Sequence, residues 1–150
     1  MTVDSQTRKI MNLDDFLGPK PDVIDLHAEN RWAAIDELLY HLVATHKIKS
    51  EHRDAIAKSV KKRESSMSTG IGFGIGLPHA STDLISEMVG TLGRSRKGIQ
   101  FDALDGKPVV LVMLFLVPQG QFQKHLPTLA NLAKQLHNPG FRDGLGGHPG

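Results

Sequence analysis

Nine consecutive apolar residues, 109–117, constrain the fold of this 150-residue chain more than any other feature. The run is rich in Val and Leu and contains no polar side chain, which is typical of a strand covered on both faces of its sheet. It is far shorter than the roughly 18 apolar residues that a membrane-spanning helix needs. We therefore expect a central strand with a layer on either side, and no insertion into a membrane.

The spacing of apolar residues predicts two helices in the first half of the chain. Apolar residues recur at helical spacing over residues 31–46, directly after Asn30, which is a good N-cap. Ser50 is a second candidate N-cap, for a helix that runs to about residue 62. The apolar face of this second helix is thin, so we expect it on the outside of the molecule.

Short strands are predicted over residues 23–26 and 88–93, in addition to the apolar run. A third helical pattern covers residues 126–136, and Pro127 is compatible with it if it lies in the first turn. Strands mixed with helices in this order favour an α/β fold, a mixed β-sheet flanked by helices.

Four glycines alternate with large apolar residues over residues 69–77, just before Pro78 and His79. In an extended strand the glycines would share one face, which suggests that something, such as the backbone of another protein, approaches there closely. Pro78 is expected to end the strand, leaving His79 after an abrupt strand end. The glycines do not form a phosphate-binding loop, because no Lys follows them. They do not form the dinucleotide fingerprint either, because the third glycine of its G-x-G-x-x-G spacing is missing.

Charge and cysteine content narrow the function classes. The chain has no cysteine and no apolar leader, so we expect a cytoplasmic protein. The net charge is only +2, but residues 47–63 hold seven basic and two acidic residues. This basic segment is either a solvated helix face or a surface for a phosphate or an acidic partner. The histidines show no metal-ligand spacing, so no metal or cofactor is expected.

Three blocks of sequence carry a family resemblance: Lys62-Arg63-Glu64, Ser68-Thr69-Gly70-Ile71-Gly72 and residues 74–79. Together they resemble the signature of the phosphotransferase-system IIA domains of the fructose and mannitol type, which include the nitrogen-regulatory IIA proteins. Gly76, where the family usually has Ala, and Leu77 are the deviations. Similar segments follow at Phe101 and at His125. The resemblance covers roughly residues 10–143 and implies a mixed sheet flanked by helices.

The resemblance implies a site and its partners. His79 would be the phosphorylated histidine, Arg63 would stabilise the phosphoryl charge, and His125 would lie across the site and bind the phosphoryl group or position the ring. The donor would be the histidine phosphocarrier protein. A transport member would pass the phosphoryl group to a cysteine of a separate IIB protein. In a regulatory member, phosphorylation would set the binding to a kinase or a transport regulator.

The expected organisation is one domain over residues 11–143, between a flexible leader, residues 1–10, and a disordered Gly-rich tail, residues 144–150. The family normally continues with a final helix after the region of Phe141 and Arg142. A domain without that helix would expose apolar surface, so we expect self-association as a homo-oligomer.

The favoured function is a nitrogen-type regulatory IIA protein that carries a phosphoryl group on His79. One alternative is a fructose or mannitol IIA component that serves sugar transport. From another class, the chain would be a non-catalytic binding module that uses the basic segment 47–63; its eight aromatic residues and lack of a known motif argue against nucleic acid. A metal-dependent hydrolase is a distant third.

Overall fold

The computed structural model describes residues 23–72 and 74–137. The predicted leader and tail lie outside these residues. The strands are β1 (Val23–Asp25), β2 (Gly70–Gly72), β3 (Ile75–Gly76), β4 (His79–Thr82), β5 (Val89–Ile99) and β6 (Val109–Pro118). The helices are α3 (Arg31–Ala44), the 3-10 helix η1 (Ser50–His52), α4 (Arg53–Ser66) and α5 (Phe122–His137).

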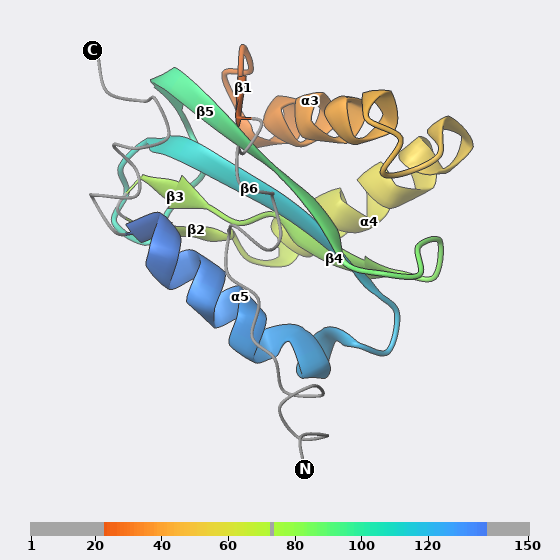
Figure 1. Cartoon of the computed structure of the whole chain (residues 1–150). Coiled ribbons are helices and arrows are strands. Elements are labelled where there is room, and N and C mark those ends of the chain that lie inside the picture. The colour runs from red at the N-terminus through yellow and green to blue at the C-terminus, as the bar shows by residue number, and fades with distance from the viewer. Residues whose placement is uncertain (1–22, 73, 138–150) are drawn as a thin grey trace.

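The strands form one mixed sheet in the order β1-β5-β6-β3-β2, with β4 also pairing with β6 (Figure 1). β5 runs antiparallel to β6, whereas β3 and β4 run parallel to it. Phe115 of β6 pairs with Gly90 of β5 and with His79 of β4, so β4 and β5 lie on opposite edges of β6. The expected α/β fold with a mixed sheet flanked by helices is confirmed.

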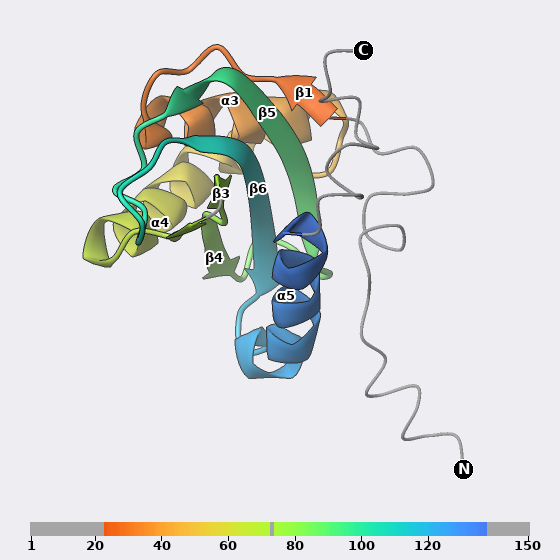
Figure 2. The ribbon, with the colours of Figure 1, turned by 90° about the vertical axis from the view of Figure 1, so that its left-hand side faces the viewer.

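β6 supplies side chains to two separate cores. Its even-numbered residues 112, 114 and 116 pack with α3 and α4, and its odd-numbered residues 111–117 pack with α5. Figure 2 shows α3 and α4 on one side of the sheet and α5 on the other. The prediction of a central strand covered on both faces is confirmed, because the period of two along a strand sends successive side chains to opposite faces.

The first two helices follow the predicted spacing, with one correction. Asn30 caps α3 as predicted, and its side-chain oxygen accepts a 2.9 Å hydrogen bond from the backbone N–H of Ala33. Ser50 is not the N-cap of α4. It begins η1 instead, where the N–H of His52 donates to the carbonyl of Lys49, and α4 starts after that turn. The thin apolar face of α4 is buried against α3 and the sheet.

The glycine run is a hairpin and not the single strand that the alternation predicts. β2 and β3 run antiparallel, and Gly72 and Gly74 on either side of the turn have φ angles of +94° and +79°. Only glycine adopts these angles without strain, which is why the alternation cannot continue as one extended strand.

The bare face of this hairpin is filled by the chain itself. A Cβ atom at Gly70 would lie 2.8 Å from the Cβ of Ala103, and one at Gly76 would lie 2.9 Å from the ring of Phe101. The N–H of Leu104 donates to the carbonyl of Gly70 in the same contact. The close approach predicted from the glycines exists, but the connection between β5 and β6 makes it, so an approaching partner backbone is not needed to explain the glycines.

α5 begins earlier than its apolar pattern predicts. Its first residue is Phe122, so Pro127 is the sixth residue of the helix and not part of the first turn. A proline at this position cannot donate to the carbonyl of Gln123, four residues before it. The helix is tolerated because Leu129, Leu132 and Leu136 are buried against the sheet, and tertiary packing outweighs the missing hydrogen bond.

Candidate functional site

His79 lies where an interrupted strand resumes. β3 and β4 follow the same edge of β6, and Leu77 and Pro78 separate them. Pro78 has no N–H for the ladder, but its carbonyl accepts a 3.2 Å hydrogen bond from Phe115 of β6. β3 therefore ends before Pro78, as predicted, but the ladder with β6 resumes at once, since His79 is the first residue of β4. Its imidazole is carried by a strand that is fixed to the central strand of the sheet.

The imidazole of His79 is held by one hydrogen bond and two aromatic rings. Its Nδ1 lies 2.8 Å from the carbonyl oxygen of Leu77. The ring lies nearly parallel to Phe115, at 5.0 Å between centroids, and to Phe122 of α5, at 5.5 Å. A carbonyl only accepts, so Nδ1 must carry the proton, and in the neutral ring Nε2 keeps a free lone pair.

Burial lowers the pKa of His79 below its ordinary value of 6.5, because the charged imidazolium loses hydration. The positive charge of Arg63 lowers this pKa further. The hydrogen bond to Leu77 and the carboxylate of Glu64 act in the opposite direction without reversing the shift. The neutral ring is therefore the favoured form near pH 7.

A pocket of about 470 Å³ opens beside His79. Its lining residues from α4 are spaced as one helix face and are Ser59, Lys62, Arg63 and Ser66; those from β4 and α5 are His79, Ala80, Ser81 and Phe122. None of these lining residues carries a carboxylate. The structure therefore brings two of the predicted site residues, His79 and Arg63, to one pocket, which Lys62 also lines. The serines were missed, although the i, i+3, i+4, i+7 spacing along α4 could have identified them.

Arg63 is in the last turn of α4, and its Nη1 donates a 2.9 Å hydrogen bond to the carbonyl of Met67. A cation at this end of a helix also compensates the negative end of the helix dipole. Arg63 has five N–H donors in a planar fork, so further donors remain for the oxygens of an anion in the pocket.

Glu64, next to Arg63, is a buried carboxylate to which the sequence analysis assigned no role. Its oxygens accept hydrogen bonds from the N–H and the hydroxyl of Thr69, at 3.0 and 2.5 Å, and from Nη1 of Arg31 at 3.2 Å. Arg31 and Ser68 also donate to the carbonyl of Phe101. This network joins the start of α3, the end of α4, the approach to β2 and the loop before β6, so it fixes the helix end that carries Arg63.

A family model described as "Phosphoenolpyruvate-dependent sugar phosphotransferase system, EIIA 2" matches residues 20–146 of the chain. The chain belongs to this EIIA family. The description of the family names EIIA as a component of a phosphoenolpyruvate-dependent phosphotransferase system.

Relatives within the EIIA family come from both of its functional groups. The fructose-specific EIIA component of Haloferax volcanii is 41% identical over 95 residues, which cover 63% of this chain and 62% of the relative. The nitrogen regulatory protein of Escherichia coli K12 is 35% identical over 112 residues, which cover 74% of this chain and 67% of the relative. The chain spans 62% of the first of these relatives and 21% of the fructose-specific EIIABC component of Bacillus subtilis.

Solved structures of EIIA proteins share the fold. The nitrogen regulatory protein IIA-Ntr of Neisseria meningitidis superimposes with a TM-score of 0.72 at 29% identity over 82% of both chains. The mannitol IIA of Escherichia coli, in complex with phosphorylated IIB, gives 0.70 at 17% identity over 89% of this chain and 90% of that one. At that lower identity the similarity shows the fold alone.

His125, the third predicted site residue, is the fourth residue of α5 and follows Phe122 by one turn. Its Nε2 lies 3.4 Å from the side-chain oxygen of Gln121. Partial burial lowers its pKa, and the charge of Lys124 lowers it further. His125 is not among the residues that line the pocket, and it follows by one turn Phe122, whose ring stacks on His79.

Other features of the described residues do not compete with this site. A larger pocket of about 710 Å³ lies around the β2–β3 turn and the connection between β5 and β6, but none of its lining residues is a histidine or carries a hydroxyl group. No group of three metal-binding side chains occurs within residues 23–72 and 74–137. No helix in these ranges is long and apolar enough to cross a bilayer.

Proposed function

We propose that Nε2 of His79 accepts a phosphoryl group from the phosphohistidine of the histidine phosphocarrier protein. The observation that carries this proposal is the 2.8 Å contact between Nδ1 and the Leu77 carbonyl, because it leaves Nε2 as the nitrogen with a free lone pair. The lowered pKa of His79 keeps that lone pair available at neutral pH.

The transfer exchanges one phosphorus–nitrogen bond for another. The bond between phosphorus and the donor's imidazole breaks, and a bond between phosphorus and Nε2 of His79 forms. The electron pair of the broken bond stays on the donor's ring nitrogen. The proton on Nδ1 of His79 remains in its hydrogen bond with Leu77, so the imidazolium formed is stabilised by a carbonyl oxygen. The step needs no metal or nucleotide, since it depends on positioning and charge stabilisation.

Arg63 and His125 have supporting roles in this proposal. Arg63 lines the same pocket as His79 and would donate to the phosphoryl oxygens. His125, neutral because its pKa is lowered, would donate one N–H to the phosphoryl group when the site is loaded. Its position one turn after Phe122 supports this role, which requires a movement of the first turn of α5 or of the side chain.

We favour a nitrogen-type regulatory role for the carrier. The nitrogen regulatory relatives include that of Bradyrhizobium diazoefficiens, 27% identical over 128 residues that cover 85% of this chain. In this role the phosphorylation state would set the binding to a regulatory kinase or transporter. The alternative is a sugar-transport IIA component that passes the group to a separate IIB protein, favoured by the 41% identity to the fructose-specific component. A cytoplasmic location and self-association remain predictions.

The test is phosphorylation by phosphoenolpyruvate, enzyme I and the histidine phosphocarrier protein, followed by intact mass measurement. We expect one acid-labile phosphoryl group, absent in His79→Ala and reduced in Arg63→Ala. A folded sample that takes no label would overturn the proposal and would leave a binding module as the leading function. Transfer of the label onward to a cysteine of a IIB protein would favour the transport alternative.

A further inference from the structure

The orientation of the His79 imidazole depends on few contacts. Within the described residues, one hydrogen bond reaches the ring, from Nδ1 to the carbonyl oxygen of Leu77. The side chain of His79 is partly exposed and lines a pocket, so water can replace this carbonyl if the imidazole turns away. A hydrogen bond that exchanges for one with water favours one arrangement by only about twofold to tenfold. The hydrogen bond alone therefore does not fix which ring nitrogen carries the proton.

Phe115 restrains the imidazole from the interior of the protein. It faces His79 across the ladder between β4 and β6, and its ring lies at 2° to the plane of the imidazole. Phe115 is 2% exposed and packs among the apolar residues between the sheet and α5. It does not line the pocket, so it leaves the pocket side of the imidazole open.

Phe122 covers the imidazole on the pocket side. Its ring lies at 14° to the imidazole, with 5.5 Å between the centroids. Aromatic rings attract one another at separations of about 4.5–7 Å. Unlike Phe115, Phe122 lines the pocket. Its ring therefore occupies the space into which the imidazole of His79 would turn by rotation about the Cα–Cβ bond.

The position of Phe122 is set by α5 and not by His79. Phe122 packs against the same apolar cluster as Leu129 and Leu136, which follow it by about two and four helical turns. Just before α5, the N–H of Gln121 donates to the carbonyl of Pro118 and closes the turn that leads out of β6. The helix therefore holds this ring against His79 whichever way the imidazole is turned.

We propose that Phe122 is a positioning residue that keeps the imidazole of the empty form turned so that Nδ1 donates to Leu77 and Nε2 takes the phosphoryl group. This inference rests on the proposed function, since it names what selects the reacting nitrogen at the same site. Phe122 forms no bond to the phosphoryl group. It acts by excluding the other rotamers of His79, which the hydrogen bond alone leaves accessible.

The first test locates the proton without any phosphoryl donor. Nitrogen NMR of the unmodified chain should show His79 with a protonated Nδ1 and a bare Nε2, and averaged shifts of these two atoms would overturn the inference. Phe122→Ala should bring the two shifts together, because the imidazole can then leave Leu77. Phe122→Tyr keeps an aromatic ring and should keep the shifts apart. The control, Leu126→Ala, removes a 41%-exposed apolar side chain one turn further along α5 and should leave them unchanged.

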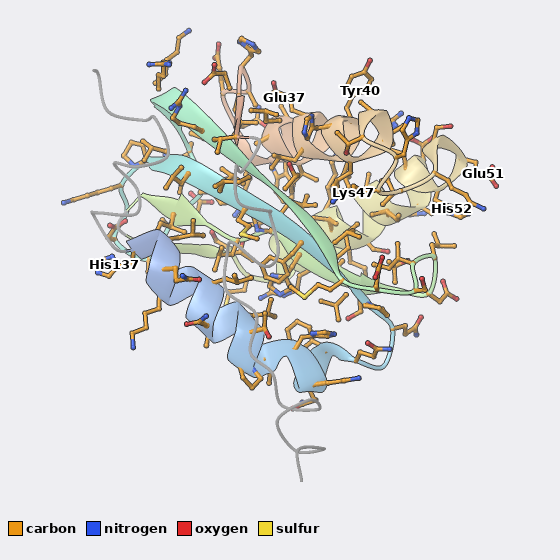
Figure 3. All side chains as sticks on the ribbon, in the orientation of Figure 1. Glu37, Tyr40, Lys47, Glu51, His52 and His137 are labelled. Carbon is orange, nitrogen blue, oxygen red and sulfur yellow. The ribbon has the colours of Figure 1, made fainter. Side chains whose placement is uncertain are left out.

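His52 is the internal reference for this measurement. Figure 3 shows it at the connection between α3 and α4, and these helices lie on the side of the sheet opposite α5. Its ring nitrogens should keep their shifts in every variant. Equal changes at His52 and His79 in Phe122→Ala would indicate a general loss of structure and would overturn a specific role of Phe122.

The second test identifies the nitrogen that is phosphorylated. Phosphoramidate delivers a phosphoryl group to histidine without a protein interface. Its phosphorus–nitrogen bond breaks, ammonia leaves, and a phosphorus–nitrogen bond to the imidazole forms. Phosphorus NMR distinguishes the Nδ1 and Nε2 products. We expect Nε2 alone in the unmodified chain, Phe122→Tyr and Leu126→Ala, and roughly a tenth or more of the label on Nδ1 in Phe122→Ala.

The outcomes separate the inference from the proposed function. A folded Phe122→Ala variant whose nitrogen shifts stay apart, or whose label stays on Nε2 alone, overturns the inference while the proposed function stands. Label on Nδ1 in Leu126→Ala as well overturns it too, because any lost apolar side chain of α5 then has the same effect. If the unmodified chain takes no label on His79, or takes it on Nδ1, the proposed function itself fails and the inference fails with it.

Discussion

At the scale of single residues, the decisive group is the imidazole of His79, and its pH behaviour can be predicted. Burial lowers its pKa, so protonation, which removes the nucleophile, requires a pH below the ordinary value of 6.5. We expect the rate of phosphorylation by phosphoramidate to stay level from pH 8 down to 6.5 and to fall only below that. The unfolded chain binds the proton first as the pH decreases, so His79 also lowers stability below about pH 6.5.

The measurement is a pH–rate profile together with an NMR titration of the His79 ring. Its matched control is His46, an exposed histidine after α3 that does not line the pocket beside His79. An inflection at or above pH 6.5 for His79 would show that burial does not govern its protonation.

Which single residues could be predicted from sequence depends on how local their role is. His79 and Arg63 were identified by motif, and the structure brings them to one pocket. The aromatic rings of Phe115 and Phe122 could not be identified in this way. The contact of Phe115 with His79 depends on the register between β4 and β6, and that of Phe122 depends on where α5 starts. The residues around His79 in the sequence determine neither of these features.

At the scale of secondary-structure elements, the packing of the hairpin predicts the effect of a methyl group. Gly76→Ala would introduce the residue usual in the family, but its Cβ would lie 2.9 Å from Cε2 of Phe101. The core around Phe101 is fully buried, so overpacking should cost about 1–3 kcal/mol in the free energy of unfolding. Urea denaturation measures this loss.

A double-mutant cycle identifies the cause of that loss. Phe101→Leu removes the ring atoms that meet the new methyl group, so Gly76→Ala should cost clearly less in this background than in the original chain. Equal costs in the two backgrounds would mean that the glycine is needed for a reason other than the Phe101 ring.

The elements themselves were predicted unevenly. The helix after Asn30 and the apolar strand β6 followed from periodicity, because each repeats one pattern over many residues. The hairpin of β2 and β3 did not, since glycine adopts extended and left-handed angles equally well and alternation does not reveal which is used. The strand β4 was missed because Pro78 ends most ladders, whereas here the ladder resumes one residue later.

At the scale of the whole molecule, Glu64 connects elements that are distant in the sequence. Glu64→Gln keeps the shape of the side chain but weakens its hydrogen bonds with Arg31 and Thr69. Arg31 still donates its hydrogen bond to the carbonyl of Phe101. We expect the free energy of unfolding to fall by about 1–3 kcal/mol. The control is Asp36→Asn, the same chemical change in a partly exposed pair with Lys61, which should cost less than about 1 kcal/mol. Similar losses in both variants would contradict a structural role for the network.

The fold class could be predicted at this scale, but the arrangement of the strands and helices relative to one another could not. A long apolar strand among helical patterns is enough to indicate a covered mixed sheet. The order of the strands and the Arg31–Glu64 contact depend on which distant segments meet, and a single sequence does not record such pairs. For the same reason the charged segment 47–63 looked uniform in sequence, whereas in the structure cations from it line two separate pockets.

The anchoring of His79 determines what kind of signal the molecule can give. The imidazole is held by strand β4, a carbonyl and two rings, so the backbone that carries His79 need not move when a phosphoryl group is added, and any rearrangement is confined to the first turn of α5 and its side chains. The sheet of the loaded and empty forms is then the same, and the two forms differ at His79 by about two negative charges on the phosphoryl group, of which the imidazolium offsets one. A receptor that distinguishes the two forms must therefore recognise the added charge, because the sheet itself keeps its shape.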